Sequence, residues 1–198
     1  DVPIGITTGP DDNLWFAAAG SSGVGRITPA GVATHFFDVS MNAPQEIISG
    51  PGGHLWVTAF SASKLARVTT AGVITLFTDP SGETSLPRGL VEGLDGNVWF
   101  TNTDVGTIGR ITPSGTFTSF DADEIVGPEH LALGPDDQLW LTDSSSGIVK
   151  LRCHDGLPFT DVSPSHPFAA EICWMSSEGV STGFEDGTYK PAIAVSRQ

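Results

Sequence analysis

Short apolar runs alternate with turn residues along most of the chain. In the first stretch these runs cover Ile4–Thr8, Leu14–Ala18, Val24–Thr28 and Val32–Phe37. Glycine, proline, aspartate and asparagine separate them, and these residues supply the backbone angles at which a hairpin reverses. No segment of about 12 residues within 1–152 shows the apolar period of a helix. The pattern predicts β-strands joined by tight turns.

The strands belong to a repeat that is most visible in the tryptophans. A tryptophan and a proline each recur four times, 41, 43 and 41 residues apart: Trp15, Trp56, Trp99 and Trp140, and Pro3, Pro44, Pro87 and Pro128. A basic residue recurs at nearly the same spacing: Arg26, Arg67, Arg110 and Lys150. Four strands every 40 to 45 residues are typical of a β-propeller blade. We therefore predict an all-β fold of four four-stranded blades, followed by a small α-helical segment at the C-terminus.

The repeated residues are expected to be structural. The tryptophan should pack where one blade lies on the next. The arginine stem should cover apolar surface while its charged head pairs locally. The acidic turns Asp11–Asn13, Asp95–Asn97 and Asp136–Gln138 could suggest calcium, but hairpin chemistry explains them without a metal.

Composition narrows the classes of partner. The chain has 198 residues, of which 23 are acidic and 9 are Lys or Arg, so its formal net charge is −14. Nucleic acid binding needs a basic surface, so this composition argues against it, and an anionic membrane surface is disfavoured for the same reason. No apolar run approaches the roughly 20 residues that span a bilayer. The chain begins with Asp1 and shows no signal peptide, so we expect a processed chain or part of a longer one.

The repeat pattern ends inside the fourth unit, near Gly156 and Pro158. We therefore predict two domains, residues 1–156 and 157–198. In the second, apolar residues at i, i+4 and i+7 after Pro167 predict a helix (Phe168, Ile172, Met175). Two free thiols are favoured over a disulfide for Cys153 and Cys173, and their spacing does not favour zinc.

The first domain resembles a known family through its motifs. The segments Gly9-Pro10-Asp11-Asp12-Asn13-Leu14-Trp15-Phe16 and Ile108-Gly109-Arg110-Ile111-Thr112-Pro113 are similar to the repeats of virginiamycin B lyases, also called streptogramin lyases. The resemblance covers residues 3 to about 156. It implies a seven-bladed propeller, of which these four blades are a part. It also implies an Mg²⁺-dependent elimination that opens the macrocyclic streptogramin ester, and no other cofactor is expected.

The active site of that family is not matched in this chain. The resemblance places a catalytic histidine directly after the repeat proline and a catalytic glutamate 14 residues later. Those paired positions hold Ile4 and Ala18, Gln45 and Ala59, Arg88 and Asn102, and Glu129 and Asp143. No catalytic residue is therefore assigned; the candidates for the propeller channel are Gln45, Arg88, Asn102, Glu129 and Asp143.

Two further expectations concern the fourth repeat. Glu129 and Asp143 could lie close enough for a weak cation site or a raised pKa, although two solvated carboxylates are favoured, and no metal site is predicted. His130 stands one position late, so strand alternation should turn it to the other face. The other histidines are expected at the surface: His35, His54, His154 and His166.

Residues 159–198 resemble an S-layer homology module. The matching elements include Phe159-x-Asp161-Val162, Asp186-Gly187-x-Tyr189-x-Pro191 and Val195-Ser196-Arg197. Phe168 stands where many members carry tryptophan, and the second helix of the module is missing. The resemblance implies attachment to cell-wall polysaccharide that bears acidic groups. It makes Arg197 and Asp161 the candidate ligand contacts, since a guanidinium suits bidentate capture of a carboxylate; a frayed terminal residue is the alternative for Arg197.

Two functions follow from these observations. The first is a secreted bacterial cell-surface protein, extracellular and attached to the cell wall, whose propeller displays a binding face for an unknown ligand. The second is a streptogramin-type C–O lyase whose catalytic blades are missing or degenerate here. The missing His/Glu pair favours the first, so we expect no lyase activity. Four blades of an implied seven also predict an open arc rather than a closed ring.

Overall fold

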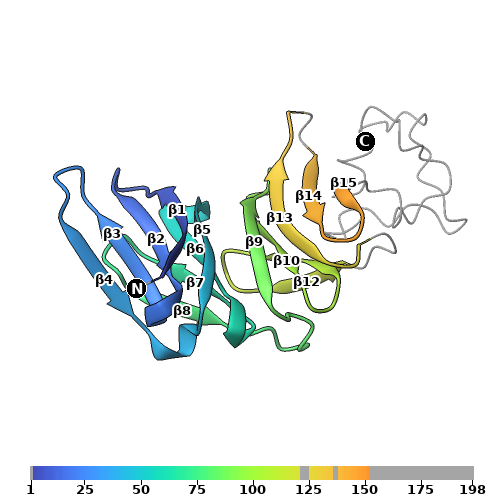
Figure 1. The fold of residues 1–198 in the computed structure, drawn as a ribbon, viewed down its shortest axis with the longest axis horizontal. Helices are drawn as coiled ribbons and strands as arrows, with labels where there is room; N and C mark the ends of the chain where they lie inside the picture. The colour runs from blue at the N-terminus through green and yellow to red at the C-terminus, as the bar shows by residue number, and fades with distance from the viewer. Residues whose placement is uncertain (1, 121–124, 136–137, 152–198) are drawn as a thin grey trace, which may run out of the picture. The chain divides into compact units, whose positions relative to one another are not determined.

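The computed structural model describes residues 2–120, 125–135 and 138–151. Within these ranges, consecutive strands pair antiparallel into three four-stranded sheets and one three-stranded sheet. We call the sheets blades 1 to 4 in chain order, and Figure 1 shows them from blue to orange. The prediction of an all-β fold built from repeated sheets is confirmed. The fourth sheet has three strands in its described part.

Each blade repeats the same succession of strands. Blade 1 contains β1 (Pro3–Thr8), β2 (Leu14–Ala18), β3 (Gly23–Ile27) and β4 (Ala33–Phe37). Blade 2 contains β5 (Pro44–Gly50), β6 (His54–Ala59), β7 (Lys64–Val68) and β8 (Ile74–Phe77). Blade 3 contains β9 (Pro87–Glu92), β10 (Val98–Asn102), β11 (Thr107–Ile111) and β12 (Phe117–Phe120). Blade 4 contains β13 (Pro128–Leu133), β14 (Leu139–Asp143) and β15 (Gly147–Lys150).

Short 3-10 turns complete the described part of the chain: η1 (Ala19–Ser21), η2 (Val39–Met41), η3 (Pro51–Gly53) and η4 (Phe60–Ala62). No helix among the described residues has the length and apolarity needed to cross a membrane. The helix predicted after Pro167 and the two cysteines lie outside the described residues.

The hydrophobic cores lie between neighbouring blades. Trp15 of blade 1 is buried in one cluster with Ile47 and Leu55 of blade 2. Trp56 of blade 2 is buried in another cluster with Leu90 and Val98 of blade 3. For these two tryptophans, the predicted role in inter-blade packing is confirmed. The face of each sheet is stabilised by the next sheet rather than by a core of its own.

The repeat arginines of blades 1 and 2 join neighbouring blades, whereas the sequence predicted local pairing of their charged heads. The guanidinium of Arg26 lies 5.6 Å from the Trp15 ring centroid and donates to the carbonyl of Thr70 in blade 2 at 3.0 Å. Arg67 stacks on Phe77 at 5.5 Å and donates to the carbonyl of Pro113 in blade 3 at 2.8 Å. Each side chain therefore covers an aromatic ring and fixes the turn of the following blade.

The acidic turns hold the tryptophan side chains. Asp11 accepts a hydrogen bond from the indole N–H of Trp15 at 2.9 Å, and Asp95 accepts one from Trp99 at 3.2 Å. In blade 2 the corresponding turn position is Gly52, and the buried indole nitrogen of Trp56 has no hydrogen-bond partner. These aspartates thus hold the hairpin turn and also fix the tryptophan side chain, and the hairpin role is the one that the turn chemistry predicts.

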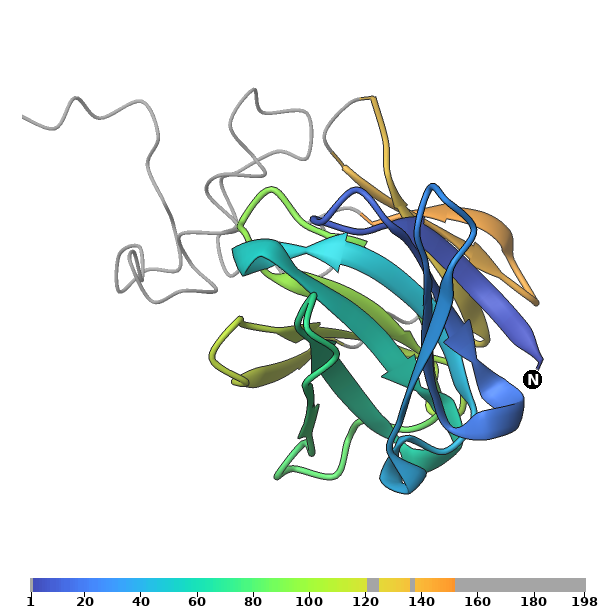
Figure 2. The same ribbon diagram turned by 90° about the vertical axis from the view of Figure 1, so that its left-hand side faces the viewer.

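The first strands of the blades form an inner layer. Strand β5 contacts β1 and β9, and β9 contacts β13; we call these four the inner strands, and Figure 2 shows the twist of the sheets that contain them. A buried threonine on the second strand ties them together. Thr58 accepts from the N–H of Glu46 at 3.0 Å and donates to the carbonyl of Arg88 at 3.0 Å. Thr101 accepts from Gly89 at 2.8 Å and donates to Glu129 at 2.9 Å.

Candidate functional site

A β-bulge follows the repeat proline in every blade. The pairing register shifts between Pro3 and Ile6, between Pro44 and Ile47, and between Pro128 and Leu131. In blade 3 the shift lies opposite the same segment, between Phe100 and Asn102. A bulge places two residues opposite one and interrupts the alternation of side chains. Both residues after the proline can therefore contribute to the inner surface.

Four charged or titratable side chains form two pairs between inner strands. The guanidinium of Arg88 on β9 forms an ion pair with the carboxylate of Glu129 on β13. Nδ1 of His130, also on β13, lies 3.3 Å from Oε2 of Glu46 on β5. We call Glu46, Arg88, Glu129 and His130 the inner-strand cluster. It joins blades 2, 3 and 4, and its members are between 27% and 57% exposed.

Glycine at the intervening position brings β9 and β13 close together. A Cβ atom on Gly89 would lie 2.7 Å from the Glu129 carbonyl oxygen and 2.7 Å from Cα of His130. Gly5 stands at the same repeat position in blade 1, and its Cβ would lie 2.7 Å from the carbonyl oxygen of Gln45. The position two residues after the proline thus alternates between glycine and a polar side chain. The glycines permit the close approach of strands on which the cluster depends.

The structure gives His130 a partner that the sequence did not predict. Strand alternation assigned it to the face opposite the channel, but the bulge between Pro128 and Leu131 breaks that alternation. Its ring instead reaches Glu46, on an inner strand two blades away. The expected surface position of His35 also needs correction, because its half-buried ring contacts Phe16 and stacks on Phe37 at 5.9 Å.

Asp143 is a buried carboxylate that holds the backbone around it. It accepts hydrogen bonds from the N–H groups of Val126 and Gly127 at 2.9 Å, and from those of Ser145 and Ser146 at 2.8 Å. Burial alone would raise the pKa of Asp143, but these four hydrogen bonds outweigh it and hold the pKa below its ordinary value. The surroundings of Asp143 therefore lower its pKa, whereas the sequence had left a raised pKa open.

Asn102 and Gln45, two other candidates, differ in what surrounds them. The Asn102 amide is buried, donates to the hydroxyl of Thr107 at 3.0 Å and accepts from the N–H of Ser85 at 3.3 Å. It closes a loop as Asp143 does. Gln45 is half-buried on β5, next to Glu46. Of the five channel candidates, the structure brings Arg88 and Glu129 into direct contact.

The donors at the paired positions do not fit Mg²⁺, the ion that the resemblance implies. Mg²⁺ prefers carboxylate and carbonyl oxygens in octahedral geometry. Both oxygens of Asp143 are engaged by backbone N–H groups, and Glu129 is paired with Arg88. Ala18 and Ala59 offer no ligand atom. In the part of the chain that the structure describes, no group of three or more His, Cys, Asp or Glu side chains could hold a metal ion.

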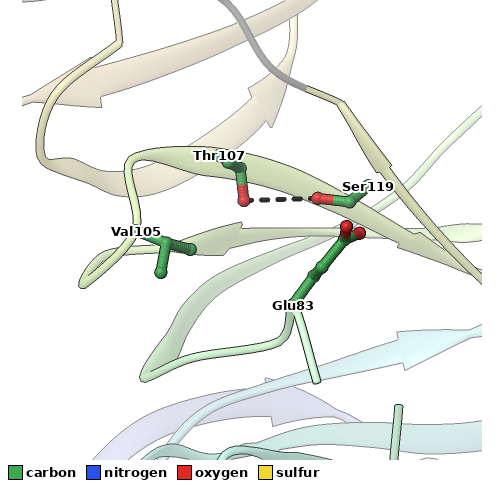
Figure 3. A pocket seen from close by; sticks show the side chains of 4 residues that line it. All are labelled: Glu83, Val105, Thr107 and Ser119. Carbon is green, nitrogen blue, oxygen red and sulfur yellow. Dashed lines mark hydrogen bonds between the residues drawn. The ribbon is translucent and has the colours of Figure 1, made fainter. Parts of the chain in front are cut away.

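A hollow lies on blade 3 (Figure 3). It has a volume of about 400 Å³ and is lined by Glu83, Val105, Thr107 and Ser119. Glu83 stands in a loop that Asp79 organises by accepting hydrogen bonds from Ser81 and Thr84, backbone and hydroxyl alike. Burial alone would raise the pKa of Asp79, but these hydrogen bonds have the larger effect and hold the pKa below its ordinary value.

The remaining candidates lie outside the described residues: Asp161 and Arg197. The residue that the sequence interpretation missed is Glu46. Its signal was present in the sequence, since Gly5, Glu46, Gly89 and His130 occupy one repeat position. Reading that position across the blades, rather than along one strand, would have paired Glu46 with His130.

Comparison with known proteins accounts for both parts of the chain. Residues 1–156 match the virginiamycin B lyase family, and residues 158–198 match the S-layer homology domain. A solved streptogramin B lyase is 24% identical with a TM-score of 0.67, over 75% of this chain and 53% of that one. A catalytically inactive virginiamycin B lyase from Staphylococcus aureus, solved with quinupristin, is 31% identical with a TM-score of 0.67, over 75% of this chain and 54% of that one.

This chain thus spans about half the length of those structures. No match was found among curated proteins. The family match extends over the four described sheets and the repeat that builds them. The chain therefore belongs to the virginiamycin B lyase family.

Proposed function

We propose that this chain is part of a wall-attached bacterial surface protein whose propeller blades present the inner-strand cluster to a ligand. The observation that carries the proposal is the order of the two matches, blades at 1–156 followed by an S-layer homology domain at 158–198. S-layer homology domains bind cell-wall polymers in general, so the second part supplies the attachment. The first part is then held outside the cell, where it meets soluble molecules.

The chemistry of the inner strands supports binding rather than the lyase reaction. The paired positions contain no histidine. Their two carboxylates are already engaged, Asp143 by four backbone N–H groups and Glu129 by Arg88. A cluster of opposite charges on partly exposed strands is instead suited to hold a polar ligand.

Attachment is proposed to run through Arg197. An acidic wall polymer repels a chain of net charge −14, so a local cation must provide the contact. Residues 158–198 contain two basic residues, Lys190 and Arg197. Arg197 follows Ser196 in the element where the family resemblance places the anion contact, and Asp161 is the second candidate contact.

Sedimentation with purified bacterial cell walls tests the attachment. The full chain is compared with Arg197→Ala and, as a matched control, with Lys190→Ala, in the same buffer and at two salt concentrations. We expect the wild type and the lysine variant to co-sediment and the arginine variant to stay in the supernatant. Equal retention of all three would remove Arg197 from the site, and release of the wild type by moderate salt would leave only non-specific charge.

A further inference from the structure

We propose that the inner-strand cluster binds an organic cation, a primary amine carried by a hydroxyl-rich ligand such as an amino sugar, with Glu46 as the carboxylate that receives the ammonium group. The inference rests on the proposed function, because it names the ligand class of that binding face. It goes beyond attachment to the wall, which involves another part of the chain.

Glu46 differs from three buried or half-buried aspartates in what it contacts. Asp11, Asp79 and Asp143 accept hydrogen bonds from neighbouring residues of their own turns or loops. Glu46 is 27% exposed, and its contact is an imidazole from another blade, 3.3 Å away. An imidazole carries a full positive charge only in its protonated form. In the neutral form it leaves the Glu46 carboxylate without a full countercharge.

The charge of the whole cluster then selects a cation. Arg88 and Glu129 neutralise each other through their ion pair. With a neutral imidazole, Glu46 gives the cluster a net charge of one negative unit. The chain as a whole carries −14, so its field attracts cations and repels anions. An ammonium group pairs a full positive charge with a carboxylate through short hydrogen bonds, whereas a neutral amide can donate a hydrogen bond but brings no countercharge.

The rest of the cluster suits hydroxyl groups. The Arg88 guanidinium is 36% exposed and has five N–H donors, one nitrogen of which contacts Glu129. Glu129 is 27% exposed and retains acceptor positions. These donors and acceptors lie on β9 and β13, which approach closely because Gly89 carries no side chain, and His130 of β13 links them to Glu46 of β5. A ligand with one ammonium and several hydroxyls can therefore satisfy these groups together.

The test is calorimetric titration of the full chain with glucosamine, at fixed pH and ionic strength, and with N-acetylglucosamine as the neutral probe of the same shape. We expect glucosamine to bind at least tenfold more tightly than the acetylated sugar. Glu46→Gln should lower the affinity for glucosamine at least tenfold. Glu83→Gln, which removes an exposed carboxylate of the blade 3 hollow, should leave it unchanged.

Two histidine variants separate a specific site from general electrostatics. His130→Lys places a permanent cation beside Glu46 and should abolish binding, whereas His130→Gln should preserve it. Circular dichroism confirms that each variant is folded. Equal affinity for the two sugars, no binding of glucosamine to folded wild type, or full binding by Glu46→Gln would each overturn the inference. In those cases continued sedimentation of the wild type with cell walls would leave the proposed attachment standing.

Discussion

Blades 1 and 2 differ from blades 3 and 4 at the last residue of the second strand. In the first pair this residue is Ala18 or Ala59, both fully buried, and a 3-10 turn follows it directly (η1 and η4). In the second pair it is Asn102 or Asp143, whose side chain bonds to the backbone of the loop that leads into the inner strand. At this repeat position, two blades have an alanine followed by a tight turn, and the other two have a polar side chain that holds a loop.

The comparison shows that an acidic residue at a family position can serve to hold the backbone of a loop. Asp143 stands where the resemblance places a catalytic glutamate, and it is acidic. Its oxygens nevertheless receive four backbone N–H groups, which leaves it little capacity to act on a substrate or a metal. The inner surface of this chain is therefore defined by the residues after the repeat proline rather than by the ends of the second strands.

The largest expected effect is that of Asp143→Ala. The substitution leaves four backbone N–H groups without their acceptor, and we expect the free energy of unfolding to fall by about 3 kcal/mol. Asn102→Ala removes a neutral group with two hydrogen bonds and should cost about 1 to 2 kcal/mol. Urea unfolding followed by tryptophan fluorescence measures both. Equal costs for the two variants would contradict the distinct role of the carboxylate.

The stability of the blades should fall in acid. The pKa values of Asp11, Asp79 and Asp143 are lower in the folded chain than their ordinary value. Their contribution is therefore fully present above the ordinary aspartate pKa of about 3.9 and is lost as the pH falls through the lower folded values. Urea midpoints at neutral pH, pH 4 and pH 3 should decrease in that order. Asp143→Ala should show a shallower decrease than the wild type, and an identical slope would contradict the assignment.

A smaller effect distinguishes two threonines of the same repeat position. Thr101 is buried and links blade 3 to blade 4 through the Gly89 N–H and the Glu129 carbonyl, so Thr101→Val should cost about 1 to 2 kcal/mol. Thr142 is exposed and accepts from the N–H of His130 in its own blade, so Thr142→Val should cost less than about 0.5 kcal/mol. Thermal unfolding of the wild type and the two variants measures both losses of stability. A larger loss for Thr142→Val would show that the link between blades is not what the hydroxyl contributes.

Most of the fold could be predicted from the sequence because its determinants are repeated. Trp15 and Trp56 make equivalent contacts in neighbouring blades, and so do Arg26 and Arg67, so their spacing alone identifies all four as structural residues. The turn chemistry of Asp11 is likewise local, since it involves residues two and four positions away.

The site was less predictable, because its contacts join strands far apart in the sequence. Arg88 and Glu129 were identified as candidates, but no spacing rule states that they pair between neighbouring blades. The bulge after the proline interrupts strand alternation at His130, and it is visible only once the register of β13 and β14 is known. Asn102 and Asp143 were proposed as channel candidates, but each accepts hydrogen bonds from backbone N–H groups, which leave no trace in a side-chain pattern.

Incubation of the full chain with quinupristin and Mg²⁺ tests most directly the claim that the family's paired positions have become structural. The mass of the product distinguishes the intact macrocycle from the opened one, and a solved member of the family serves as the positive control. We expect no opened product above the enzyme-free reaction. Opened product that disappears in a folded Asp143→Asn or Glu129→Gln variant would contradict the account, because it would give these carboxylates a catalytic role.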